Sequence, residues 1–227
     1  MKTGIIIQAR TTSSRFPEKI FYKIKGKMVL EYVIEECLNV AETILAVPKK
    51  QVKYFEEIAQ KYNISVFGGS EDDLAERYYK TAEKYNLQTI IRITSDCPLI
   101  NSLIIQKTLD FYNENKYDYV INTSLETEYK NKNNNEIEYK SETLLGDGFD
   151  VEIFSFEALV KTYLNAKSKS EKEHLTIWMK ENLNCGVFDD LFLCAHGKFS
   201  LDEEKDLKGI ETFMELKNAG FVKEGKL

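Results

Sequence analysis

The chain has 227 residues and a formal net charge of -6, from 31 Lys and Arg against 37 Asp and Glu. Hydrophobic residues make up 43% of the chain and no Gly-rich or Pro-rich tract is present, which excludes disulfide scaffolds, collagen-like chains and disordered tails. The negative charge argues against a protein that coats nucleic acid, because such proteins present a basic surface. The length predicts one domain, residues 1–227, with a sizeable core.

The sequence has no features of a membrane span or a secretory signal. Its apolar runs, such as residues 4–7, are far shorter than the roughly 20 residues that a span needs. Gln8 and Arg10 interrupt the first of these runs at once. The four cysteines lack CxxC spacing and are expected to be reduced thiols. We therefore expect a cytoplasmic protein with neither a nucleic-acid nor a membrane partner.

The first 120 or so residues alternate between strand and helix patterns. In chain order we expect a strand at 3–9, a helix from 28, a strand at 42–47, a helix over 52–62, a strand at 64–67, a helix at 72–85 and a strand at 88–94. Such alternation is typical of βαβ units and predicts an α/β protein with a largely parallel sheet.

The second half has a less regular pattern. Residues 123–150 are rich in Asn, Lys and Glu and predict a hairpin-like excursion that is too short to bury a core of its own. The patterns that follow predict a strand at 150–154, helices at 156–164 and 171–182, two short strands within 185–195 and a helix from 203.

The loop after the first predicted strand is unusually basic. Arg10, Arg15 and Lys19 lie there with four hydroxyl side chains, and such groups hold a polyphosphate. Ligands of open α/β sheets bind at the carboxyl ends of strands, which is where this loop begins. The loop lacks the glycine spacing of a dinucleotide fingerprint or a P-loop. Its charge pattern is equally typical of a solvated basic loop.

Two carboxylates follow later strands. Asp96 comes directly after the strand at 88–94, and Asp202 follows a short predicted strand and precedes the last helix. Mg²⁺ binds one or two carboxylates and fills its shell with phosphate oxygens and water, so this pair predicts a magnesium site. Each residue also has a structural alternative: Asp96 as a turn cap before Pro98, and Asp202 as the N-cap of the last helix.

Several segments together resemble the cytidylyltransferases that make CMP-sugars. The resemblance is to the spore-coat-polysaccharide type, related to the 3-deoxy-manno-octulosonate and acylneuraminate enzymes. It is carried by Ile7-Gln8-Ala9-Arg10 with Ser13, Arg15, Pro17 and Lys19, by Glu71-Asp72-Asp73 with Glu76-Arg77-Tyr78, by Arg92 to Leu99, and by Asp150-Val151-Glu152, Glu173-His174-Leu175-Thr176, Leu201-Asp202 and Asp206-Leu207. Their order and spacing cover nearly the whole chain.

The resemblance implies a three-layer α/β/α Rossmann-like nucleotidyltransferase fold and a homodimer. It also implies transfer of CMP from CTP to an acidic sugar or a sugar or polyol phosphate, with Mg²⁺ and release of pyrophosphate, in the synthesis of surface polysaccharide precursors. The positions that match nucleotide contacts are Gln8, Ala9, Arg10, Ser13, Arg15, Lys19, Arg77 and Ser95. Asp96 and Asp202 match the metal-binding aspartates, and Asp150, Glu152 and His174 lie where the sugar pocket is expected. Arg10, Arg15, Lys19 and Asp96 are the implied catalytic residues.

Three positions depart from the family pattern. Thr12 and Glu18 stand where the first loop of the family often has glycine, and Glu204 stands where a proline is usual. A carboxylate at position 18 is unfavourable beside a triphosphate unless it points outward or pairs with a lysine. The expected sugar-pocket residues have structural alternatives too: His174 as a surface residue of a charged helix, and the 150–152 pair as a solvated strand edge.

The implied reaction is attack of an acceptor oxygen on the α-phosphorus of CTP, for which the protein aligns the reactants and neutralises charge. A second hypothesis is a metal-dependent glycosyltransferase on a similar fold. Such enzymes typically carry an Asp-x-Asp pair after a sheet strand, whereas this chain has Asp96-Cys97-Pro98. A third is a nucleotide-binding protein without catalytic activity. Pyrophosphate release in the presence of an acceptor separates the three.

Overall fold

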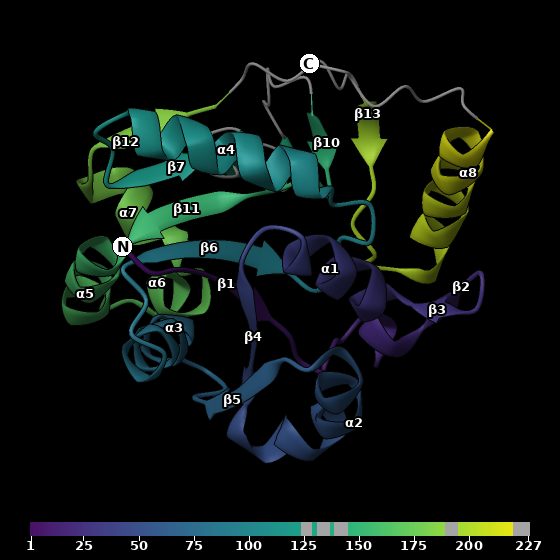
Figure 1. Cartoon of the computed structure of the whole chain (residues 1–227), viewed down its shortest axis with the longest axis horizontal. Coiled ribbons are helices and arrows are strands. Elements are labelled where there is room, and N and C mark those ends of the chain that lie inside the picture. Colours follow the sequence, from purple (N-terminus) through teal and green to yellow (C-terminus); the bar gives the residue numbers. More distant parts are fainter. Residues whose placement is uncertain (124–128, 131–136, 139–144, 189–194, 220–227) are drawn as a thin grey trace.

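A seven-stranded sheet forms the centre of the computed structural model, which describes residues 1–123, 129–130, 137–138, 145–188 and 195–219 (Figure 1). The strands are β1 (Thr3–Gln8), β4 (Glu42–Pro48), β5 (Ser65–Gly69), β6 (Thr89–Thr94), β7 (Tyr119–Ile121), β11 (Glu152–Ser155) and β12 (Cys185–Val187). Their order across the sheet is β12-β7-β11-β6-β1-β4-β5. All neighbouring pairs are parallel except those of β11, which is antiparallel to both β6 and β7. The predicted, mostly parallel sheet is therefore confirmed.

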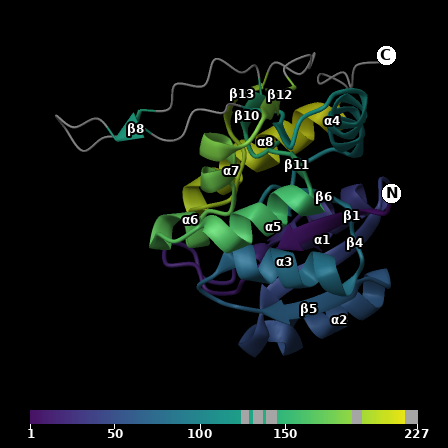
Figure 2. The ribbon, with the colours of Figure 1, turned by 90° about the vertical axis from the view of Figure 1, so that its left-hand side faces the viewer.

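Helices cover both faces of this sheet (Figures 1 and 2). They are α1 (Val29–Leu38), α2 (Val52–Tyr62), α3 (Leu74–Lys84), α4 (Ser102–Glu114), α5 (Phe156–Asn165), α6 (Lys169–Glu173), α7 (Thr176–Asn182) and α8 (Leu207–Asn218). Apolar residues of α1, α2, α4 and α8 pack in one core cluster, and those of α3, α5 and α7 pack in another. The expected three-layer α/β/α arrangement follows from these two cores. None of the described helices combines the length and apolarity that crossing a membrane requires.

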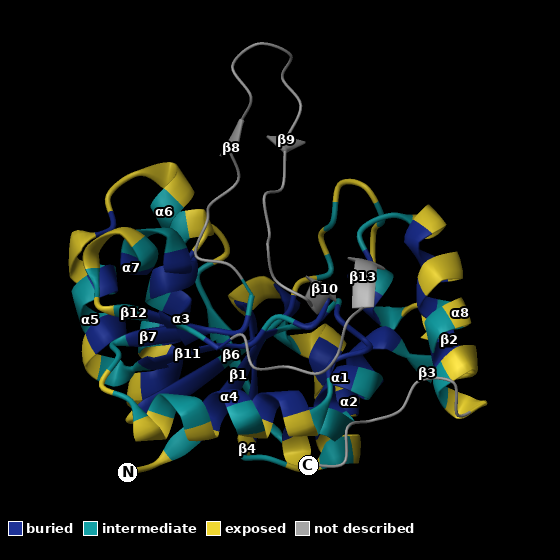
Figure 3. Cartoon of the chain, turned by 90° about the horizontal axis from the view of Figure 1, so that it is seen from above, coloured by how far each residue is buried: buried dark blue, intermediate teal, exposed yellow. Residues whose placement is uncertain are grey.

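The strand β1 explains why the first apolar run of the sequence does not alternate with polar residues. Ile5 and Ile7 belong to one core cluster and Ile6 to the other, and all three are fully buried. A central parallel strand is covered by helices on both faces, so every position between its ends favours an apolar side chain. Figure 3 shows β1 and β6 buried beneath helices whose outer faces are exposed.

Short strand pairs lie outside the main sheet. They are β2 (Lys23–Ile24) with β3 (Lys27–Met28), β8 (Tyr129–Lys130) with β9 (Ile137–Glu138), and β10 (Leu145–Asp147) with β13 (Ala195–Lys198). The antiparallel β8–β9 pair lies within the excursion expected at 123–150, most of which lies outside the described residues. Of the two strands expected within 185–195, β12 lies in that range and β13 begins at its end, while 189–194 are not described.

Two predicted helices differ from the structure. The helix expected over 171–182 is wrong, because the chain breaks between α6 and α7: Leu175 is buried in the core and the Thr176 hydroxyl donates to Glu152. The helix expected from 203 begins later. A 3-10 turn, η3 (Glu204–Asp206), precedes α8 and begins at the position of one of the expected departures. Two other 3-10 turns are η1 (Lys19–Phe21) and η2 (Lys49–Gln51).

A buried ion pair crosses the middle of the sheet. The carboxylate of Glu152 on β11 contacts the guanidinium of Arg92 on β6 and accepts hydrogen bonds from the Tyr119 hydroxyl at 2.7 Å and the Thr176 hydroxyl at 2.9 Å. The side chain of Glu152 is only 5% exposed. The solvated edge considered for this position is therefore wrong, because β11 lies between two other strands.

We expect Glu152→Ala to lower the free energy of unfolding by about 3–5 kcal/mol, because it leaves the charge of Arg92 without its partner in the interior. Urea denaturation measures this change. The matched control is Glu157→Ala, which removes the exposed partner of Lys161 on α5 and should leave the transition midpoint unchanged. Equal midpoints for the two variants would contradict a structural role for Glu152.

Candidate functional site

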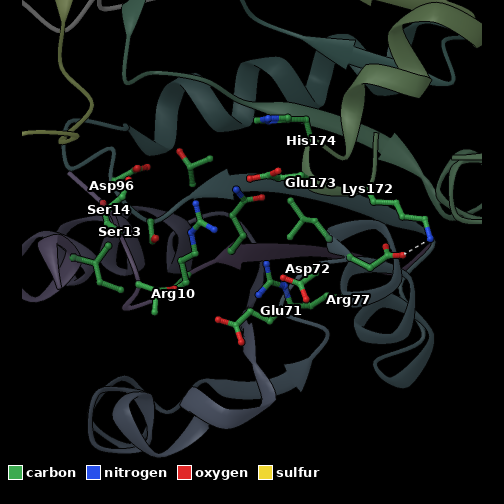
Figure 4. Close-up of a pocket in the computed structure, with 18 of the residues that line it drawn as sticks. Arg10, Ser13, Ser14, Glu71, Asp72, Arg77, Asp96, Lys172, Glu173 and His174 are labelled. Carbon is green, nitrogen blue, oxygen red and sulfur yellow. Dashed lines mark ion pairs between the residues drawn. The ribbon is translucent and has the colours of Figure 1, made fainter. Parts of the chain in front are cut away.

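A cavity of about 920 Å³ opens where β1 and β6 end (Figure 4). Its size is typical of small-molecule sites, and its position at the carboxyl ends of parallel strands is where open α/β sheets bind ligands. Asp96 and Ser13 lie near one end of the view in Figure 4, and Lys172 lies at the other. His174 faces Arg10 across the cavity.

The described lining of the cavity is rich in charge and net positive. Eight of its side chains are basic: Arg10, Arg15, Lys19, Arg77, Arg92, Lys167, Lys169 and Lys172. Six are carboxylates: Glu71, Asp72, Asp73, Asp96, Glu173 and Asp202. The whole chain carries a net charge of -6, so the cavity has the opposite sign to its host. Such a local excess of cations favours an anionic ligand.

The most specific feature of the cavity is a lysine between two aspartates. The Lys19 ammonium contacts Asp96 Oδ2 at 2.7 Å and Asp202 Oδ1 at 2.9 Å, and its side chain is 12% exposed. Burial lowers the pKa of this lysine, but the two carboxylates outweigh burial and the net pKa is raised. Lys19 thus meets Asp96, which lies 77 positions later in the chain, and Asp202, which lies 183 positions later.

Asp202 is surrounded by cations. Besides Lys19, Arg15 approaches Oδ1 at 3.3 Å and Lys198 approaches Oδ2 at 2.9 Å. Burial raises the pKa of Asp202, but hydrogen bonds and charges from Lys19 and Lys198 prevail and hold it at about 2. This carboxyl is therefore an anion at any physiological pH.

Asp206 holds the turn that presents Asp202. Its buried carboxylate accepts hydrogen bonds from the backbone N–H of Asp202 at 2.9 Å and of Glu203 at 2.8 Å. The helix-capping role considered for Asp202 is thus wrong: Asp206 satisfies these amides, and the Asp202 side chain lines the cavity. The sequence alone predicts no role for Asp206, because its partners in this turn are backbone N–H groups.

The loops that carry the two aspartates are tied together through the backbone. The N–H of Leu201 donates to the carbonyl of Asp96 at 2.8 Å. Close by, Gly148 has φ of 110°, and a Cβ at this position would lie 2.5 Å from the carbonyl carbon of Phe199. Only glycine lets the segment after β10 approach the segment before Asp202 so closely. The separation of Asp96 and Asp202 is therefore set by main-chain contacts as well as by Lys19.

The basic first loop closes on itself. The N–H of Glu18 donates to the carbonyl of Thr11 at 3.0 Å, and Gln51 accepts from the N–H of Thr11 at 2.7 Å. Glu18 has φ of 56°, a left-handed conformation that glycine adopts most readily, which explains the glycine expected there in relatives. Glu18 is exposed and is not among the residues that line the cavity. Its carboxylate thus does not oppose an anionic ligand.

Arg77 is a buried cation of the cavity lining with two unsatisfied donor nitrogens. It lies on α3 with its stem against Gly69, where an added Cβ would lie 2.7 Å from Arg77 Cγ. Its Nε and Nη1 atoms are buried and have no hydrogen-bond partner among the described residues. Burial, with a contribution from nearby Arg10, lowers the pKa of Arg77. Because buried donors without an acceptor are costly, Nε and Nη1 of Arg77 are suited to donate hydrogen bonds to an oxygen of a ligand.

Arg92 lines the cavity, although the sequence analysis gives it no role in the site. Its Nε donates to Gln8 Oε1 at 3.0 Å, and the same oxygen accepts from the Tyr78 hydroxyl at 3.3 Å. The buried pair with Glu152 therefore fixes Arg92, which in turn fixes Gln8. One charged residue in an otherwise apolar strand was the available signal for Arg92.

The break between α6 and α7 forms the opposite wall. His174 follows the last residue of α6 as its C-cap, is exposed and lines the cavity, and the next residue, Leu175, is buried in the core. Lys172 contacts Asp73 at 3.4 Å and so links this wall to the start of α3. Lys167 and Lys169, which also line this wall, were not identified from the sequence.

The structure brings most of the expected site residues into this one cavity. The lining includes Gln8, Ala9, Arg10, Ser13, Arg15, Lys19, Arg77, Ser95, Asp96, His174 and Asp202. Asp150 and Glu152, expected at the sugar pocket, do not line it. Asp150 accepts hydrogen bonds from Thr123 at 3.1 Å and from the N–H of Gly148 at 3.2 Å, so it joins the two ends of the excursion. Glu152 is committed to the buried pair with Arg92.

Asp96 and Asp202 fit a magnesium ion whose remaining coordination positions a bound ligand fills. Within the described residues, no group of three or more His, Cys, Asp and Glu side chains is placed to hold a metal. Asp96 and Asp202 supply two carboxylates, and the Lys19 ammonium already holds a positive charge between them. Mg²⁺ typically takes one or two carboxylates together with phosphate oxygens and water. These residues therefore fit the ion only together with a phosphate ligand.

A basic cavity at the carboxyl ends of a parallel sheet, with a carboxylate pair at one end, is typical of α/β proteins that bind nucleotides. A family model described as cytidylyltransferase matches residues 4–211. The chain belongs to the cytidylyltransferase family.

Named relatives agree with the resemblance to the CMP-sugar enzymes. An uncharacterized protein of Methanocaldococcus jannaschii is 32% identical over 81% of this chain and 69% of its own length. A 3-deoxy-manno-octulosonate cytidylyltransferase of Blochmanniella floridana is 31% identical over 48% of this chain and 46% of its own length. The spore coat polysaccharide biosynthesis protein SpsF of Bacillus subtilis is 26% identical over 53% of this chain and 54% of its own length. The superfamily expected from the motifs is confirmed.

The fold also matches a solved relative. A cytidylyltransferase from Leptospira borgpetersenii superposes with a TM-score of 0.80 at 25% identity, over 100% of this chain and 99% of that one. The expected nucleotidyltransferase fold is thereby confirmed.

The low pKa of Asp202 predicts how the stability of the protein changes at acid pH. Because its pKa is about 2 in the folded protein and 3.8 ordinarily, it contributes stability that is present above pH 3.8 and lost as the pH falls through 2. The free energy of unfolding of the wild type should fall between about pH 4 and about pH 2.5. That of Asp202→Asn should fall by about 1 kcal/mol less over the same interval. Urea denaturation at both pH values measures this. Asp110→Asn, at an exposed position of α4, is the matched control and should follow wild type; an identical loss in Asp202→Asn would contradict the ion-paired geometry.

Proposed function

We propose that the protein is a magnesium-dependent cytidylyltransferase that transfers CMP from CTP to an acidic sugar or a sugar or polyol phosphate, and releases pyrophosphate. The observation that carries this proposal is the convergence of Lys19, Asp96 and Asp202 at one end of a basic cavity. Two carboxylates beside many cations suit a metal-bound polyphosphate better than a lone sugar or a nucleic acid.

Different residues of the cavity would have different roles in nucleotidyl transfer. Arg10, Arg15 and Lys19 line the side of the first loop and would neutralise the charge that develops on the departing pyrophosphate. Asp96 and Asp202 would hold Mg²⁺, which supplies charge neutralisation at the phosphate oxygens when bound. Fixed side chains also align the acceptor oxygen with the phosphorus, which lowers the entropic part of the barrier.

The base and ribose would lie toward Gln8 and Arg77. The amide oxygen of Gln8 already accepts from Arg92, so its orientation is set before a ligand arrives. The unpaired Nε and Nη1 atoms of Arg77 would donate to an oxygen of the nucleotide. The name of the Blochmanniella relative, a cytidylyltransferase, supports CTP as the nucleotide.

The acceptor would bind against the wall formed by α6. Lys167, Lys169 and His174 line this side and would face a carboxylate or phosphate of the sugar. The names of two relatives, the 3-deoxy-manno-octulosonate cytidylyltransferase and the spore coat polysaccharide biosynthesis protein, support this acceptor class. A homodimer and a cytoplasmic location complete the proposal, and analytical ultracentrifugation tests the former.

One assay tests the activity. The protein is incubated with Mg²⁺, each nucleoside triphosphate in turn, and a panel of acidic sugars and sugar and polyol phosphates, and pyrophosphate is measured. Release that requires both CTP and an acceptor is the expected result. Binding of CTP without pyrophosphate release across the panel would favour the catalytically silent protein. Transfer from a preformed nucleotide-sugar would favour the glycosyltransferase.

We expect Asp96→Asn to lower kcat by about a hundredfold or more while leaving the melting temperature near that of wild type, because a metal-binding carboxylate matters most when charge develops in the transition state. Steady-state pyrophosphate release at saturating Mg²⁺ measures the loss. Asp110→Asn on the exposed face of α4 is the matched control. Near-normal turnover in Asp96→Asn would remove this residue from the site.

Arg77→Met separates ligand binding from folding. We expect it to weaken CTP binding about tenfold or more, since it removes charged hydrogen bonds to the ligand. The stability of the free protein should stay equal or rise, because the substitution removes an unpaired buried charge. Calorimetric titration with CTP and urea denaturation measure the two effects, with Lys80→Met on the exposed face of α3 as the control. Unchanged affinity together with a loss of stability would make Arg77 a structural residue instead.

A further inference from the structure

Lys19 stands where a cation shared by Asp96 and Asp202 would have to bind. Its ammonium lies within 2.7 Å of one carboxylate oxygen and 2.9 Å of the other, in a position that is 12% exposed. A Mg²⁺ ion approaches its oxygen ligands to about 2.1 Å. An ion that bound both oxygens from the side on which the ammonium lies would overlap it, so the lysine competes with a metal for this position.

We propose that Lys19 is an exchangeable counter-ion, which occupies the cation position between Asp96 and Asp202 in the nucleotide-free protein and leaves it for the triphosphate when a divalent cation arrives with the nucleotide. The inference rests on the proposed function for the identity of the incoming anion. It adds an order of events: in the free protein the lysine blocks the metal, and the nucleotide removes the block.

The charges around the two carboxylates support this exchange. Asp202 is contacted by Lys19, Arg15 and Lys198, of which Arg15 also contacts Glu203 and Lys198 also contacts Asp206. Among the contacts of the described residues, Lys19 alone of these three cations also contacts Asp96, so its charge is the one that most strongly repels an ion shared by the two aspartates. That repulsion falls when the ammonium moves to another anion. A triphosphate in the cavity offers such an anion to the residues of the first loop.

The build of Lys19 suits a change of partner. Its main chain is anchored at the start of η1, where its N–H donates to the carbonyl of Phe16 at 3.3 Å and its own carbonyl accepts from the N–H of Tyr22 at 3.1 Å. The side chain ends in a compact charge on a flexible four-carbon stem, unlike the rigid fork of arginine. Rotation about side-chain bonds can therefore move the ammonium from the carboxylates toward the cavity while the loop stays in place.

Binding of Mn²⁺ to the nucleotide-free protein tests this exchange without any turnover. Free Mn²⁺ is followed by electron paramagnetic resonance during titration of wild type, Lys19→Met and Lys198→Met. We expect Lys19→Met to bind Mn²⁺ at least about tenfold more tightly than wild type, because the substitution removes a positive charge from the cation position itself. Lys198→Met is the matched control: it removes a charge from Asp202 but leaves the ammonium between the two carboxylates, and its gain should stay below about threefold on the same reasoning.

The gain should also depend on Asp96. Adding Asp96→Asn to Lys19→Met should return the Mn²⁺ affinity to the wild-type level, which places the gained site at this carboxylate. An unchanged affinity in Lys19→Met, an equal gain in Lys198→Met, or a gain that survives Asp96→Asn would each overturn the proposal.

A second readout covers a variant that is too unstable to titrate. The melting temperature of Lys19→Gln should rise with added Mg²⁺ in the absence of nucleotide, and that of wild type should not, since a ligand stabilises the folded state that binds it. A matching rise in both proteins would also overturn the proposal. If pyrophosphate release fails while Mn²⁺ binding behaves as expected, the proposed activity is wrong and the counter-ion exchange stands.

Discussion

The parallel pairing of β1 with β6 is the constraint on which the site depends. In this pairing Gln8 lies opposite Thr94, so the loops that follow the two strands leave the sheet side by side. The basic first loop and the loop of Asp96 therefore meet, and Lys19 reaches the carboxylate at 2.7 Å. A second tie, from Leu201 to the carbonyl of Asp96, brings the last loop to the same edge. The cavity is the consequence of this convergence.

Of the four charged residues that are buried in the described part of the chain, Glu31, Glu152 and Asp206 are ion-paired and Arg77 is not. Glu152 neutralises Arg92 within the sheet, and three cations surround Asp202. Arg77 is buried with two donor nitrogens that no described residue satisfies. An interior tolerates such a group when a ligand supplies the missing acceptor, which supports the proposed place of this arginine on the nucleotide side of the cavity. Lys19, by contrast, is paired with Asp96 and Asp202, and we interpret this pairing as the arrangement of the nucleotide-free protein.

The sequence predicted the elements of the first half well, because alternating strands and amphipathic helices there follow local periodicity. It predicted less where distant partners decide the conformation. The helix through His174 is broken because Leu175 enters the core and Thr176 binds Glu152, and neither contact leaves a periodic trace in the sequence. For the same reason Glu152 was expected near a sugar, whereas its partners on β6, β7 and α7 commit it to the interior.

The sequence by itself determined the α/β class, the basic loop after the first strand, and the two aspartates that follow later strands. Each of these features depends only on residues that are close together in the chain. The tertiary structure decided which of these groups meet. Only the folded sheet places Lys19 between Asp96 and Asp202, leaves two nitrogens of Arg77 without a partner among the described residues, and keeps Glu18 out of the cavity lining. These outcomes depend on contacts across the chain, such as the 183 positions that separate Lys19 from Asp202. No local pattern encodes such a distance.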